Sequence, residues 1–205
     1  MPPANSQQAR TQTKRTVVLE NDLVRVVEVR AEPGSGIELR SYPDQMVIVL
    51  EPAPAKNARP SRRFEWASGD VKRGTGIYRP AGDPATGDVS LNAARAIVIE
   101  FKQPAPQPDA ARTPSLPPPY RMTGENAHAV QFEATAAPGQ TTPQHSHGNH
   151  ILIALTDGTV EMTDAEGHKD TLQLKKDTAL FGGPLAHTSA NAGSTPLHWI
   201  VIELK

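Results

Sequence analysis

Residues 138–158 read PGQTTPQHSHGNHILIALTDG and combine turn residues, closely spaced histidines and an apolar run. His145 and His147 are two residues apart, so in an extended strand both side chains project from the same face. His150 would point to the other face of a regular strand. The dipeptide Gly148-Asn149 tolerates turn and bulge conformations, and such an irregularity would return His150 to the face of the other two rings. The stretch therefore predicts a β-strand that presents a chelating pair of imidazoles with a third ring nearby.

A fourth histidine, His187, follows in a separate apolar segment and is expected on a neighbouring strand. Neutral imidazole is the commonest protein ligand for borderline transition metals, whereas calcium and magnesium prefer oxygen ligands. The chain has no cysteine, which excludes thiolate ligands and disulfides. We therefore expect one divalent transition metal, with zinc, iron, nickel and manganese as candidates, held by His145, His147, His150 and His187.

The chain also repeats itself at a shift of about 105 residues. This shift pairs Glu20-Asn21 with Glu125-Asn126. Near the end of each copy the shift becomes 103, and IVIEFK at 97–102 matches IVIELK at 200–205. Self-similarity over such a distance predicts two structural units of the same kind.

Composition places the boundaries of these units. The polar start, residues 1–14, has the character of a disordered tail. We expect an N-terminal unit at 15–103 and a C-terminal unit at 123–205. Between them, residues 104–122 are rich in proline and favour an extended linker. The alternative for this linker is ordered coil that wraps over one sheet.

Short β-branched and apolar runs bounded by Gly, Pro or Asp predict an all-β fold, because no stretch sustains a helical period. The expected strands are 24–29, 46–50, 96–101, 151–155, 160–163, 172–174 and 199–204. Asp157-Gly158 predicts a hairpin turn, and a second turn is expected at Asp164 to Gly167. Two all-β sandwiches or barrels follow from this pattern.

The histidine spacing resembles the first motif of the cupin superfamily. In that motif a glycine precedes a His-x-His pair and a glutamate ligand follows; here Gly139 lies before His145 and His147. His150 stands where the family has its glutamate. The resemblance implies two tandem cupin barrels, also called double-stranded β-helix or jelly-roll barrels, and so a bicupin.

The segment from Asp177 to Asn191, with His187 between them, resembles the second cupin motif. Its departures are Lys176 in place of the first glycine and an exchange of the usual proline and glycine at Gly182 and Pro184. In the N-terminal unit, subtracting 105 from the first three histidine positions leads to three residues that are poor metal ligands. These are Arg40, Tyr42 and Gln45. The resemblance therefore implies a degenerate N-terminal barrel without metal.

Charge and composition argue against some kinds of binding partner. A net charge of −1 and an aromatic content of 4% provide neither a basic face nor stacking platforms, so nucleic acid is not expected. No apolar run approaches the roughly 18 residues that cross a bilayer, so no membrane partner is expected. The polar start lacks a secretory signal but would also remain after signal removal, which leaves the cytoplasm and the periplasm or exterior open. Edge strands allow a homodimer, while pairing of the repeats allows a monomer.

The sequence constrains the function of the protein less than it constrains the metal site. A metal held by imidazoles can act as a Lewis acid or, if it is iron, bind dioxygen, and both need an open coordination position. The resemblance implies a dioxygenase, isomerase, cyclase or lyase acting on a small oxygenated organic molecule. A non-catalytic, metal-dependent sensing or binding module and a purely structural metal are the alternatives. No catalytic base is evident beside the histidines, and Glu161 is the weak candidate. His128 and His168 are expected in solvent.

Overall fold

In the computed structural model, residues 13–32, 37–39, 43–52, 71–81, 89–91, 93–107 and 114–205 are described. Every regular element in these ranges is a β-strand. The first unit contains β1 (Lys14–Glu20), β2 (Val24–Arg30), β3 (Ile37–Leu39), β4 (Gln45–Pro52), β5 (Gly76–Arg79), β6 (Val89–Leu91) and β7 (Ala93–Phe101). The second contains β8 (Arg121–Glu125), β9 (Ala129–Ala136), β10 (Thr141–His147), β11 (His150–Ala154), β12 (Gly158–Thr163), β13 (Lys169–Leu174), β14 (Ala179–Gly182), β15 (Leu185–Asn191) and β16 (Leu197–Leu204).

The sheet order shows the duplication directly. The first unit has a five-stranded sheet in the order β1-β2-β7-β4-β5, and the second has β8-β9-β16-β11-β14 in the same relative order. The pair β3-β6 corresponds to β10-β15, which the second unit extends with β12 and β13 into a four-stranded sheet. All pairings are antiparallel among the described strands. The all-β, two-barrel prediction is confirmed.

The turns that open the two copies also match in detail. The Asn21 side chain accepts a hydrogen bond from the Val24 backbone N–H at 2.9 Å, and the Asn126 side chain accepts one from Ala129 at 3.0 Å. An asparagine that bonds its own backbone a few residues ahead stabilises a tight turn. The repeated Glu-Asn dipeptide therefore has a structural cause in both units.

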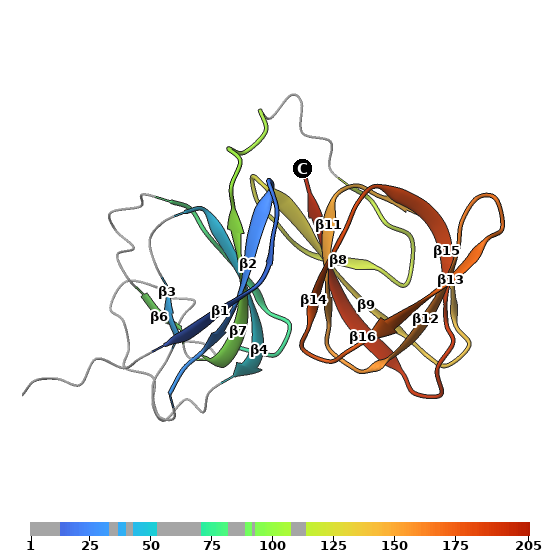
Figure 1. Cartoon of the computed structure of the whole chain (residues 1–205), viewed down its shortest axis with the longest axis horizontal. Helices are drawn as coiled ribbons and strands as arrows, with labels where there is room; N and C mark the ends of the chain where they lie inside the picture. Colours follow the sequence, from blue (N-terminus) through green and yellow to red (C-terminus); the bar gives the residue numbers. More distant parts are fainter. Residues whose placement is uncertain are drawn as a thin grey trace, which may run out of the picture.

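The two five-stranded sheets pack against each other between the barrels (Figure 1). Side chains on one face of each sheet join a shared core, and those on the opposite face fill the interior of their own barrel. Thus Ile200 and Ile202 belong to the shared core, whereas Trp199 and Val201 face the inside of the second barrel. Burial on both faces explains why these strands are continuous apolar runs with little alternation.

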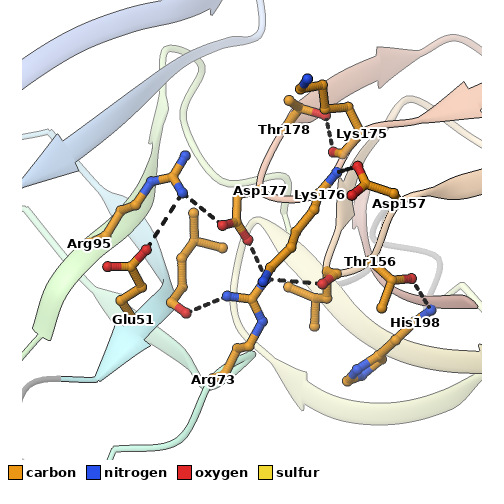
Figure 2. A network of polar contacts seen from close by, with 12 residues as sticks. Glu51, Arg73, Arg95, Thr156, Asp157, Lys175, Lys176, Asp177, Thr178 and His198 are labelled. Atoms are coloured by element: carbon orange, nitrogen blue, oxygen red, sulfur yellow. Dashed lines mark hydrogen bonds and ion pairs between the residues drawn. The ribbon is translucent and has the colours of Figure 1, made fainter.

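Polar contacts cross the same boundary. The Asp177 carboxylate forms ion pairs with Arg73 and with Arg95, both from the first unit; the Arg95 Nη1–Asp177 Oδ2 distance is 2.7 Å. Figure 2 shows Asp177 between the two guanidinium groups. Arg73 also donates to the backbone oxygen of Leu155 at 3.1 Å. The second cupin-like motif, which begins at Asp177, is therefore tied to the other barrel.

One turn prediction is confirmed and one is wrong. At Asp164 to Gly167 the chain turns tightly between the paired strands β12 and β13, with Gly167 at a φ of 85°. Asp157-Gly158 does not form a hairpin, because β11 pairs with β14 and β16 while β12 pairs with β13 and β15. The segment carries the chain from one sheet of the barrel to the other. Turn chemistry marks the change of direction but does not identify the strand's partner.

The segment before β8 lies on the second barrel from residue 114 onward. Leu116 is buried in the barrel's core, and the Tyr120 ring lies 5.8 Å, centroid to centroid, from that of Trp199. This part of the proline-rich stretch follows the alternative of ordered coil packed over the fold, and β8 begins within the range expected for the linker. Residues 108–113 and the first twelve residues lie outside the described ranges. In the described residues no helix long and apolar enough to cross a membrane occurs.

Candidate metal centre

Strand pairing brings three of the four predicted histidines together. His145 and His147 lie on β10, and the antiparallel register places His187 of β15 directly opposite His145. The Nε2 atoms of His145 and His187 are 3.1 Å apart, and the ring centroids of His145 and His147 are 4.8 Å apart. Each of the three residues is less than 9% exposed. The predicted His-x-His geometry on one strand face is therefore present.

His150 reaches the site from the opposite sheet. It begins β11, and the break at Gly148-Asn149 carries the chain from one sheet to the other instead of bulging a single strand. Its ring centroid lies 4.6 Å from that of His147. The ring packs over Gly182 of β14, where an added Cβ would lie 2.3 Å from His150 Cε1. A glycine at this position is required for His150 to stay where it is.

Oxygen acceptors fix the orientation of three rings. The Nδ1 atom of His145 lies 2.7 Å from the Pro143 carbonyl oxygen, and that of His150 lies 2.9 Å from the Gly148 carbonyl oxygen. The His147 Nδ1 atom is bonded to the Glu203 carboxylate. A carbonyl or ionised carboxylate only accepts, so each Nδ1 carries the proton and each Nε2 presents its lone pair. This is the arrangement by which proteins orient imidazole ligands toward a metal.

Glu203 is the functional residue that the sequence analysis missed. Its side chain is 1% exposed, and it holds both His147 Nδ1 and the Gly148 backbone N–H, the latter at 3.1 Å. It lies opposite His150 in the β11–β16 register. The available signal was strand alternation, since Glu203 shares a face with Trp199 and Val201 inside the barrel.

Two overlapping groups of donor atoms result. Ligand atoms of His145, His147 and His187 lie within 4.8 Å of one another, and so do those of His147, His150 and Glu203. His147 belongs to both groups. The first group is a buried set of three imidazoles, a donor set that suits a divalent transition metal. These histidines could hold a metal, whereas a ligand role for His150 stays a prediction.

Burial keeps the rings in their ligand form. Burial, together with the neighbouring imidazoles, lowers the pKa of His187 to about 4, and burial also lowers the pKa values of His145 and His150. The Nδ1 atom of His187 is buried without a hydrogen-bond partner among the described residues. Neutral rings with facing nitrogens are the form in which imidazoles bind a cation.

A cavity of about 300 Å³ opens from the histidines into the barrel. His147, His150 and His187 form its polar end. Tyr120, from the segment before β8, covers this end with its ring 5.3 Å from that of His145, and its hydroxyl is hydrogen bonded to Trp199. Burial raises the pKa of Tyr120 to about 12. Tyr120 was also missed, because it lies in a stretch that reads as a linker.

Three other histidines lie apart from the site. The expectation of a solvated His128 is wrong: it is 5% exposed, stacks on Phe101 at 4.4 Å and pairs with Asp44 across the barrel interface. His168 is exposed as expected, and His198 pairs with Glu133.

The remaining candidates have ordinary surroundings or lie outside the described residues. Glu161 forms an ion pair with Lys169 at 2.7 Å on the outer surface, so its role as a base is not supported. Gln45 is buried. Arg40 and Tyr42 fall outside the described ranges.

The fold is that of a bicupin, two cupin-type barrels in tandem, and the second barrel contains the buried histidine cluster. No protein family model matches the chain. Over 82 residues it is 27% identical to the β-alanine degradation protein BauB of Pseudomonas aeruginosa, covering 40% of this chain and 86% of that protein.

Solved structures give the same result for the fold. A structure of Bacillus subtilis oxalate decarboxylase, described with Mn(II) centres, aligns over 93% of this chain and 72% of its own, with a TM-score of 0.53 and 15% identity. A second oxalate decarboxylase structure aligns over the same shares with a TM-score of 0.55 and 14% identity. Identities this low establish the shared fold alone.

Proposed function

We propose that the C-terminal barrel binds one divalent transition metal through His145, His147 and His187, with His150 as a fourth ligand. The observation that carries this proposal is the buried cluster of His145, His147 and His187, whose ligand atoms lie within 4.8 Å of one another. The Nδ1 hydrogen bonds of His145, His147 and His150 to oxygen acceptors support it, because they leave the Nε2 lone pairs of these rings available. The manganese centres named for oxalate decarboxylase support manganese as one candidate beside zinc, iron and nickel. The N-terminal barrel, with Gln45 at the position that matches His150, serves as a packing partner without metal.

We further propose that this centre transforms a small oxygenated organic molecule, as a cupin-type dioxygenase, isomerase, cyclase or lyase. When bound, the metal would supply Lewis-acid polarisation or, if it is iron, dioxygen binding. The chain's own residues orient the metal ligands and enclose the cavity. Glu203 holds His147 in one tautomer, while Tyr120 and Trp199 shield the polar end of the cavity from water. BauB, a protein named for β-alanine degradation, gives general support for small-molecule metabolism.

Elemental analysis of protein purified without added metal tests the first proposal. We expect close to one equivalent of a single transition metal, and its loss in His145→Ala. His198→Ala is the matched control, because His198 is bonded to Glu133 away from the cavity. Retention of full metal content in His145→Ala, or no transition metal after incubation with each of the four candidates, would contradict the assignment.

A non-catalytic binding module is the alternative, and the same metal analysis separates the two. Iron together with substrate-dependent oxygen uptake, abolished in His145→Ala, supports an enzyme. Tightly bound zinc with no exchangeable water supports a binding role. A purely structural metal would instead make chelators unfold the C-terminal barrel, which circular dichroism would detect.

A further inference from the structure

Beyond the histidines, the walls of the cavity are mostly apolar. They come from both sheets of the second barrel, and most of their side chains are aliphatic. The residues that form most of this wall are Leu152, Val160, Met162, Leu172, Leu174 and Leu180. Leu180 is among the large apolar side chains left exposed in the described residues, at 36%. The apolar lining therefore extends from the metal end to solvent-accessible surface.

No charged side chain is among the described residues that line this cavity. The Glu203 carboxylate beside the histidines lies behind His147 and already uses both oxygens, one on His147 and one on the Gly148 N–H. The neutral polar groups are confined to one region: Tyr120 at the histidine end, and Ser189, which lies two residues beyond His187 on the same strand face. The cavity thus offers one polar end and an apolar remainder.

A charge buried without a partner is strongly unfavourable, so the lining restricts the ligand. A second carboxylate would find no arginine or lysine, and an ammonium group would find no free carboxylate. A charge at the far end of a longer ligand fails this condition, and so does the ammonium group of β-alanine. The substrate in the name of BauB therefore does not suit this cavity.

We propose that the ligand of the C-terminal barrel is a molecule with a single oxygen head and an uncharged apolar body. The head, a carboxylate, enolate or carbonyl, lies at the histidines beside the Tyr120 hydroxyl. The body fills the aliphatic part. Head and body together contain on the order of ten non-hydrogen atoms, since the cavity holds about 300 Å³ and a water-sized atom group takes up about 30 Å³ of liquid. The position of the head rests on the proposed metal site, whereas the apolar body rests on the cavity alone.

Three straight-chain acids that differ only at the far end test this assignment. Octanoate ends in a methyl group, suberate in a second carboxylate and 8-aminooctanoate in an ammonium group. We expect calorimetric titration of zinc-loaded protein to show octanoate binding at least about a hundredfold more tightly than either of the others. Equal or tighter binding of suberate or 8-aminooctanoate overturns the proposal, and so does zinc-loaded protein that binds none of the three.

A substitution at Met162 is expected to shift the preference from octanoate toward suberate. Met162 is half-buried on β12, so a lysine placed there can reach solvent with its ammonium group while remaining beside the cavity. Met162→Lys is expected to improve suberate binding at least tenfold and to weaken octanoate binding, while Met162→Leu keeps the original order. An unchanged order in Met162→Lys, with its fold verified by circular dichroism, counts against the assigned location.

A metal-free experiment separates this inference from the proposed function. With chelator present, 1-octanol and 8-amino-1-octanol have no acidic head, and their binding reports on the cavity alone. We expect NMR shift changes at the aliphatic wall for 1-octanol and at least tenfold weaker effects for the amino alcohol. If none of the four candidate metals binds but this preference holds, the metal proposal fails and the apolar-body inference stands. If zinc binds and the preference for 1-octanol is absent, the apolar-body inference fails and the metal proposal stands.

Discussion

Glu203 is the residue on which the orientation of His147 depends. Replacing it by glutamine keeps the shape but removes the charge and lets an amide N–H face the ring. We expect Glu203→Gln to lower metal affinity about 10- to 100-fold with little change in secondary structure, because glutamine offers one acceptor oxygen for the two N–H groups of His147 and Gly148 and carries no charge. Competition titration with a chromogenic chelator measures this. Glu133→Gln, at a partly exposed site on β9, is the control; equal loss in both variants would argue against an orienting role.

Gly182 provides a test of His150 that leaves all four histidines in the chain. In Gly182→Ala the new Cβ would collide with the His150 ring, so the ring must move. If His150 is a ligand, we expect roughly tenfold weaker cobalt binding and a changed visible absorption spectrum. Gly183→Ala is the matched control, because nothing lies within 4 Å of a Cβ there. Identical spectra for the two variants would remove His150 from the ligand set.

The lowered pKa values of the histidines predict how acid acts on the metal-free protein. His187 has a pKa near 4 in the fold against its ordinary value of 6.5, so between these values the unfolded chain binds more protons. The stabilisation is therefore complete above about pH 6.5 and is lost as the pH falls toward 4. Urea unfolding across this pH range should show a decline in unfolding free energy that is smaller in His187→Gln than in the unchanged protein. A decline of equal size in the variant would mean that the lowered pKa of His187 is not its cause.

The same residues show what sequence alone can and cannot establish about a site. His145 and His147 could be predicted because a two-residue spacing determines their common face in any strand. Glu203 could not be paired with them, since its contact depends on β16 lying beside β11, some fifty residues earlier in the chain. Tyr120 was hidden because proline content describes the local chain but not the surface on which it packs.

At the level of elements, strand positions were predictable where apolar residues cluster, but strand partners were not. The Asp157-Gly158 turn illustrates this: its residues favour a reversal, yet β11 and β12 belong to opposite sheets. His128 gives a second example, because its burial follows from the packing of one barrel on the other. The internal repeat was the strongest guide, since it predicted two similar units without any knowledge of pairing.

Asp177 lies in the turn between β13 and β14 of the C-terminal barrel, and its ion pairs connect this turn to the first barrel. Asp177→Asn keeps the side-chain size and the left-handed backbone, whose φ is 65°, but leaves Arg73 and Arg95 without their shared anion. We expect a loss of about 2 kcal/mol in unfolding free energy, less than the roughly 3–5 kcal/mol for a fully buried pair, because both arginines are partly exposed. Urea denaturation measures the loss, and Asp170→Asn, at an exposed position of β13, should change stability by less than about 0.5 kcal/mol.

For the whole molecule, the shared core means that the two barrels should not behave independently. Ile200 and Ile202 of β16 pack with residues from the first barrel's sheet, so unfolding one barrel exposes an apolar face of the other. Metal that binds only the folded C-terminal barrel would then stabilise both, by about 2.7 kcal/mol at a free concentration one hundred times the Kd. Hydrogen exchange should show slower exchange in β2, β4 and β7 on metal addition, although these strands hold no proposed ligand. Slowing confined to β9, β11 and β16 would mean that the barrels unfold separately, and that the interface, despite its apolar core and the Asp177 ion pairs, is too weak to couple them.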